Sequence, residues 1–235
     1  MRRAIVLLVC TLGASTLWAQ DAPRSAREMA PVDLTGYWAS VVTEDWAWRM
    51  HTPPKGDYAS IPLNREGTRV ANTWTEDQDG SCKAFGAATL LRVPTRAHIT
   101  WADDNTLKIE TDNGRQTRLM HFGAVEPATT HTLQGVSRAE WQIVGGRDEP
   151  PAIGAPLKVV TTGISAAWLR PNGVPVSESA VVTEYFDWFR DGDDQWFIVT
   201  TMVDDPTYLT ERLVVSSNFR REANGAKWAP KACKN

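Results

Sequence analysis

The segment Glu44–His51, EDWAWRMH, concentrates residue types that bind and polarise small molecules. Two adjacent acids precede two tryptophans, an arginine and a histidine. Aromatic faces contact apolar or aromatic groups, and a few charged side chains orient the bound molecule. This pattern predicts a ligand site with these candidate contacts: Trp46, Trp48, Arg49, His51 and, in the following loop, Tyr58. Alternatively, the tryptophans complete a core and the charges form a surface ion pair.

Three further side chains have the chemistry to move a proton or to steady negative charge. Histidine titrates near neutral pH, which suits His121 to general-base catalysis if its strand face lines an interior. Glu184 shares a strand face with Val182 and Phe186, and an acid within an apolar stripe is costly unless it is paired. Its candidate partners are Arg118, Arg96 and Lys158. Alternatively, His121 lies on the outer face, and the opposite face of the Glu184 strand is buried, which leaves Glu184 in water.

Two more residues join the candidate ligand contacts. His98 and Trp101 lie in one short run, HITW, that opens a series of predicted hairpins. His98 could hydrogen-bond a ligand if its strand face points inward. Arg118 and His121 are three residues apart on another strand, so their side chains should point to opposite faces.

Familiar catalytic signatures are absent from the sequence. It has no Gly-x-Ser-x-Gly elbow, no His-Glu-x-x-His, no Cys-x-x-Cys, no phosphate loop and no dinucleotide fingerprint. None of the four histidines shares a local metal-ligand spacing with another. The acidic run Asp191–Asp194 falls where a hairpin turn is needed, which favours a turn over a calcium loop. We therefore expect no cofactor and no metal.

The N-terminus has the pattern of a secretory signal peptide. Arg2 and Arg3 precede an apolar run that ends near Trp18, and small residues place cleavage near Ala19. We therefore assign residues 1–20 to the signal peptide and expect the protein to be exported to the periplasm or to the medium. The apolar run is too short for a membrane span, and no later segment reaches about 20 apolar residues.

Charge and cysteine content constrain the mature chain, residues 21–235. Removing two arginines leaves 23 basic side chains (25 minus 2) against 28 acidic ones, with no basic stripe for nucleic acid. Two cysteines survive cleavage, Cys82 and Cys233, and in an oxidising compartment they should form one disulfide. That pairing makes a catalytic thiol improbable. The sequence carries no signal for an oligomeric state.

Alternating apolar and polar residues predict about nine antiparallel strands. They correspond to GYWASVVT, three short runs within HITWADDNTLKIETDNGRQTRLMHFG, SRAEWQIV, LKVVTTGI, AVVTEYFDWFR, QWFIVTTMV and RLVVSSNFRRE. Asp104-Asn105 and Asp112–Gly114 separate the three runs and predict two consecutive hairpins. One short helix is expected after an Asn64 cap, although Gly67 weakens it. Closure into a barrel removes exposed sheet edges, so we predict one all-β, antiparallel barrel over residues 21–235.

The first strand resembles that of a known superfamily. DLTGYW, Asp33–Trp38, is similar to the Gly-x-Trp signature of the calycins, the lipocalin-like barrels. The resemblance implies that Trp38 closes one end of the barrel and packs against Arg220 or Arg221 on the last strand. Glu44–His51 would then lie near the opposite end, roughly 20 Å away along a strand of about 3.3 Å per residue. The chain also resembles exported bacterial proteins of no assigned activity, through VVTEDWAWRM, TPPKGDYASIPLN, RAHITWADDNTLKIETDNGRQTRLMHF and AVVTEYF.

These features lead to two functional hypotheses and a structural one. The first is an exported lipocalin-like barrel that binds a small apolar or aromatic molecule in its interior. The second is a cofactor-independent lyase, isomerase or cyclase in the same cavity, with His121 or Glu184 moving a proton and Arg49, Arg96 or Arg118 steadying charge. The third is an envelope protein with a filled core and no ligand.

Overall fold

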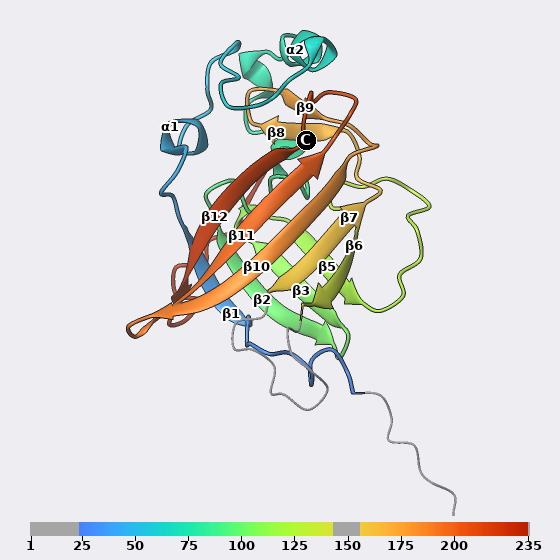
Figure 1. The fold of residues 1–235 in the computed structure, drawn as a ribbon. Coiled ribbons are helices and arrows are strands. Elements are labelled where there is room, and N and C mark those ends of the chain that lie inside the picture. The colour runs from blue at the N-terminus through green and yellow to red at the C-terminus, as the bar shows by residue number, and fades with distance from the viewer. Residues whose placement is uncertain (1–23, 143–155, 235) are drawn as a thin grey trace, which may run out of the picture.

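A computed structural model describes residues 24–142 and 156–234 and shows a closed β-barrel (Figure 1). The predicted signal peptide, residues 1–20, lies outside the described residues. Around the barrel the strands follow the order β1-β12-β11-β10-β7-β6-β5-β3-β2, and β2 pairs again with β1. Their bounds are β1 Gly36–Val41, β2 Arg96–Asp103, β3 Thr106–Thr111, β5 Thr117–Phe122, β6 Val136–Trp141, β7 Leu157–Thr162, β10 Val181–Asp191, β11 Asp194–Asp204 and β12 Leu213–Glu222.

The all-β barrel is confirmed, with one correction to its predicted topology. Each strand predicted from the alternating pattern is present, and both hairpins, β2–β3 and β3–β5, are antiparallel. However, β5 and β6 are parallel, with Met120 opposite Ser137. The chain between them, residues 123–135, returns along the outside of the barrel before β6 begins (Figure 1). A parallel pair needs such a crossover, so the barrel is mixed rather than wholly antiparallel.

Apolar side chains fill the barrel at the end where β1 begins. Trp38 is fully buried, its indole N–H donates to the Leu34 carbonyl at 2.8 Å, and its ring meets Phe197 edge-on at 4.8 Å between centroids. The Arg221 guanidinium lies over the Trp38 ring, 5.5 Å from its centroid. Arg220, the other arginine named from the resemblance, instead lies over Trp196 at 5.9 Å. Adjacent residues of a strand point to opposite faces, which is why only one arginine reaches Trp38.

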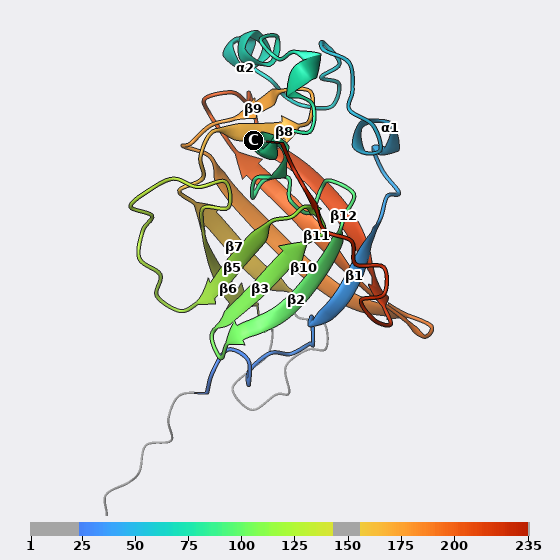
Figure 2. The same cartoon turned by 180° about the vertical axis from the view of Figure 1, so that it is seen from behind.

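The opposite end of the barrel, which we call the mouth, is covered by a cap built from residues 44–90 and 163–180 (Figures 1 and 2). Its regular elements are α1 Trp46–Arg49, α2 Arg65–Ala71, the 3₁₀ helices Glu76–Gln78 and Cys82–Phe85, and the hairpin β8 Ala167–Arg170 with β9 Val174–Val176. The predicted helix is α2, and the Asn64 side chain accepts a hydrogen bond from the Gly67 N–H at 2.8 Å. Helix α1 was not predicted, so the described residues contain two short α-helices rather than the one expected.

The cap has its own apolar core, which joins it to the barrel rim. Cap residues such as Leu169, Val174 and Val176 pack with Val182 and Val203 at the mouth ends of β10 and β11. Burial of a continuous apolar surface is the main force that holds the two layers together. None of the described helices is long and apolar enough to cross a membrane.

The C-terminal arm fastens the cap to the barrel. Strand β13, Lys231–Ala232, pairs in parallel with β4, Asn113–Gly114, and Figure 2 shows the arm rising along the barrel toward the cap. The predicted disulfide is confirmed: Cys82 in the cap is bonded to Cys233 in the arm, across a sequence separation of 151 residues. The arm and the cap are thus covalently joined.

Candidate functional site

Arg118 and Glu184 form a buried ion pair inside the barrel. Their side chains are 1% exposed, and Arg118 Nη2 donates to Glu184 Oε2 at 2.5 Å. Arg118 also donates to the hydroxyls of Ser137 at 3.0 Å and Thr161 at 2.7 Å. These four side chains come from neighbouring strands, β5, β6, β7 and β10, and so meet on the inner face. Of the three partners considered for Glu184, the structure selects Arg118.

The two candidate histidines on barrel strands, His98 and His121, lie on the outside of the barrel wall. Burial alternates along β5, with Arg118 and Met120 buried, so His121 falls on the outer face. Its Nδ1 lies 3.2 Å from the Thr106 hydroxyl. His98 is also on an outer face, where its ring stacks on Tyr37 with centroids 4.1 Å apart. Neither histidine meets the Arg118–Glu184 pair, so the structure does not assemble the proposed proton-transfer site.

A partly enclosed cavity lies where the cap meets the barrel rim, and we call it the mouth pocket. Its volume is about 50 Å³. The parts of the chain that line the pocket include helix α1, the segment after the Cys82–Phe85 helix, the end of β8 and the start of β12. Its apolar lining is Ile61, Ala84, Ala88, Val93, Leu169, Pro171, Leu213 and Val215, and its polar lining is Asp45, Trp48, Arg49, Ser60, Thr89, Arg92 and Arg170. A largely apolar wall with a few converging polar groups is typical of ligand sites.

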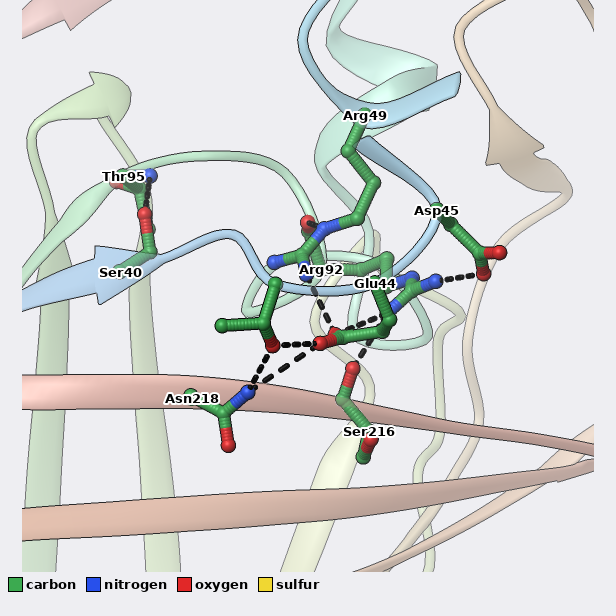
Figure 3. A network of polar contacts seen from close by, with 9 residues as sticks. Ser40, Glu44, Asp45, Arg49, Arg92, Thr95, Ser216 and Asn218 are labelled. Carbon is green, nitrogen blue, oxygen red and sulfur yellow. Dashed lines mark hydrogen bonds and ion pairs between the residues drawn. The ribbon is translucent and has the colours of Figure 1, made fainter. Parts of the chain in front are cut away.

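One side of the mouth pocket is an acid–arginine network (Figure 3). Glu44 Oε1 accepts from Arg49 Nη1 at 2.6 Å and from Arg92 Nη1 at 3.0 Å, and Arg92 Nη2 pairs with Asp45. Arg49 Nε donates to the Arg92 carbonyl at 2.9 Å. The Arg49 side chain is only 3% exposed, whereas the side chains of Glu44 and Asp45 are 31% exposed, so this is a partly buried network and not the surface ion pair considered from the sequence.

Burial of these arginines disfavours their charge. Loss of solvation and the neighbouring Arg92 charge lower the pKa of Arg49 to about 10, although Glu44 and Asp45 act in the opposite direction. Burial likewise lowers the pKa of Arg170, and Arg92 adds to the effect while Asp45 and Asp57 oppose it. A hydrogen-bond acceptor that faces either guanidinium group would therefore stabilise its charged form.

Arg170 differs from its neighbours because it has no acidic partner. The residue is 7% exposed, and its guanidinium carbon lies 5.0 Å from the centroid of the Trp48 ring. Among residues 24–142 and 156–234 its guanidinium makes no hydrogen bond and no ion pair, and the buried Nη1 has no acceptor. Trp48 is itself fixed, because its indole N–H donates to Asp57 Oδ2 at 2.9 Å.

The other predicted ligand contacts are dispersed. Trp48 and Arg49 line the mouth pocket, but Trp46, on the same helix, is 65% exposed and His51 is also exposed. Tyr58 packs against the cap core, and its hydroxyl donates to Asn72 Oδ1 at 3.0 Å. Trp101 lies at the far end of the barrel, where its ring centroid is 5.6 Å from that of Phe122.

Sequence reasoning missed Arg92 and Arg170. Each directly follows an apolar run, in AATLLR and AAWLR, and is soon followed by proline. That context was a usable signal, because a charge at the end of a buried run must be accommodated at the edge of a core.

Comparisons with protein-family models, with curated proteins and with solved structures find no match to this chain. The resemblance to calycins and to exported bacterial proteins therefore stays a prediction. The mouth pocket has to be interpreted from its own residues.

Proposed function

We propose that this is an exported, lipocalin-like barrel that binds a small molecule with an apolar or aromatic body in the mouth pocket. One observation carries the proposal: a cavity of about 50 Å³ lies where the cap meets the barrel rim, lined by apolar side chains together with Trp48 and three arginines. The signal-peptide pattern at residues 1–20 and the Cys82–Cys233 disulfide support export.

The binding site of this proposal is the mouth and not the barrel interior. The interior between β1 and β10 is filled by fully buried side chains, among them Trp38, Met120, Phe186, Phe197 and Phe219. Protein cores at this density leave few voids larger than a water molecule. A ligand therefore finds room above this core, where the cap meets the rim.

The alternative function, a cofactor-independent lyase, isomerase or cyclase, lacks comparable support. Glu184 points into the barrel and His121 points out of it. Glu184 is also held by Arg118 and is 1% exposed, so a substrate in the mouth pocket does not reach it directly. The binding function does not require Glu184 or His121 to contact the ligand.

The test is a ligand screen on the full chain, exported so that the disulfide forms. We expect members of a panel of small aromatic and aliphatic compounds to raise the melting temperature and to change tryptophan emission. Trp48→Ala should weaken binding at least tenfold, whereas Trp46→Ala, on the same helix but exposed, should leave the affinity within about twofold. A panel in which no compound shifts melting or emission would refute the proposal.

A further inference from the structure

We propose that the ligand of the mouth pocket is a monocarboxylate whose carboxylate pairs with Arg170. This inference rests on the proposed function, because it names the ligand class of the same pocket. It starts from the guanidinium of Arg170, a residue that is 7% exposed; this guanidinium makes no hydrogen bond or ion pair within the described part of the chain. Buried charges in proteins are almost always paired, and an unpaired one strongly disfavours the folded state.

The backbone that carries Arg170 is held in place by contacts of the two residues that follow the next proline. It ends β8 at a tight hairpin, where the Asn172 side-chain amide donates to the carbonyls of Pro54 at 3.1 Å and Asp57 at 3.0 Å. Gly173 follows with φ +83°, and a Cβ there would lie 2.3 Å from Trp74 Cβ. These contacts fix the hairpin to the rest of the cap and hold the backbone of Arg170 beside the pocket, which lowers the cost of ordering this part of the site on binding.

The acids nearest to Arg170 are already engaged. Asp45 pairs with Arg92, and Asp57 accepts from the Trp48 indole at 2.9 Å. The guanidinium carbon of Arg170 lies 5.0 Å from the centroid of the Trp48 ring, within cation–π range, and its buried Nη1 has no acceptor among the described residues. No described residue supplies an acceptor for Nη1, and we assign that role to the bound molecule.

A second unpaired donor lies on the same cavity. Arg49 uses Nε and Nη1 for Arg92 and Glu44, but its buried Nη2 has no acceptor among the residues that the structure describes. Arg49 and Arg170 both line the mouth pocket. A group with two acceptor oxygens can satisfy donors from two sides, and a carboxylate matches guanidinium N–H groups in charge and geometry.

Charge and size narrow the ligand to a monoanion with a small head group. Glu44 and Asp45 offset two of the three arginine charges through direct ion pairs, which leaves Arg170, with Asp57 acting on it only from a distance. A cavity of about 50 Å³ accommodates roughly three to five water-sized groups, at about 10–15 Å³ for each. That is enough for a carboxylate and its first carbon atoms, with the rest of the molecule at the opening.

The test compares acids with their neutral amides, using the full chain with its disulfide intact. Benzoate and butyrate are titrated against benzamide and butyramide at pH 7.5 and low salt, with calorimetry and tryptophan emission as readouts. We expect each acid to bind at least tenfold more tightly than its amide. Arg170→Gln should abolish this preference and change amide binding less than threefold.

The matched control is Arg220→Gln, because Arg220 also lies over a tryptophan, Trp196, but its side chain is 54% exposed. It should leave every affinity unchanged. Amides that bind as well as acids, or an Arg170→Gln protein that keeps the preference, would overturn the carboxylate assignment while the proposed function stood. Tighter binding of inorganic phosphate than of either acid would also overturn it. If neither acids, amides nor the wider panel bind, the proposed function itself fails. The comparison of acid with amide in the unmodified protein decides the question even where Arg170→Gln does not fold.

Discussion

Breaking the buried Arg118–Glu184 pair should cost more than removing it altogether. Glu184→Leu keeps the side-chain volume but leaves the Arg118 charge buried, with only the hydroxyls of Ser137 and Thr161 as partners. Arg118→Met leaves the Glu184 carboxylate in the same apolar surroundings. The double variant removes both charges and leaves Ser137 and Thr161, whose hydroxyl oxygens are 2.8 Å apart, to bond one another.

The expected magnitudes follow from where the pair lies. Both side chains are 1% exposed, and Glu184 is flanked along β10 by Val182 and Phe186, which belong to the cap and barrel cores. Removing one partner of such a pair typically lowers the free energy of unfolding by about 3–5 kcal/mol. Replacing both with apolar side chains of similar volume is often neutral or stabilising, so the double variant should lie within about 1 kcal/mol of the parent or above it.

Urea unfolding at pH 7, followed by tryptophan emission with the disulfide intact, measures all four proteins. If the free energy of unfolding has the same dependence on urea concentration in all four proteins, each exposes the same surface area on unfolding, and their midpoints can be compared. A double variant as unstable as the two single losses added together would refute the reasoning. A loss below about 1 kcal/mol in both single variants would also do so, because it would mean that the pair is hydrated.

Three further predictions concern the disulfide, the helix cap and a half-buried acid. Cys82→Ser removes a bond that spans a sequence separation of 151 residues, so it should lower the free energy of unfolding by up to about 5 kcal/mol. If the urea midpoint of the parent protein is the same with and without reductant, this prediction is wrong. Asn64→Ala should cost about 1 kcal/mol by removing the acceptor for Gly67, whereas Asn64→Asp keeps that acceptor; equal losses in urea unfolding would argue against capping. Burial raises the pKa of Asp187, so its charge disfavours the folded state, and stability is lost as pH rises through the folded-state pKa. Asp187→Asn should therefore be more stable than the parent at pH 7, with the gain vanishing below about pH 4; a gain of the same size at pH 3 would exclude this cause.

The barrel strands were predictable because their environment is two-sided. Each has one face on the core and one toward the outside, which produces an alternating pattern, as in β5 and β10. The hairpin of β8 and β9 was missed for the opposite reason. All of its strand residues are buried, so the alternation disappears. The parallel pairing of β5 with β6 was also hidden, because a loop's sequence does not specify the end of the barrel to which it returns.

Only some of the residues that line the mouth pocket could be predicted from the sequence, for a related reason. Trp48 and Arg49 belong to one dense segment, EDWAWRMH, and were found through it. Arg92 and Arg170 are far apart in the chain and meet that segment only after the cap folds onto the rim. Alternation assigns a residue to a strand face, but it does not report which residues of a non-repetitive cap will converge.

Gly67 illustrates how the cap achieves its fixed position over the pocket. In the sequence it weakens helix α2, since glycine is a poor helix former. In the structure a Cβ at this position would lie 2.4 Å from the Tyr208 carbonyl oxygen, so the helix approaches the β11–β12 connection closely only because the side chain is absent. The same connection receives the Asn64 side-chain amide at the Thr207 carbonyl, at 3.0 Å. The pocket thus lies between two layers that are joined by an apolar core and by this close contact of α2, and a ligand that bridges them should stabilise the cap and the barrel together.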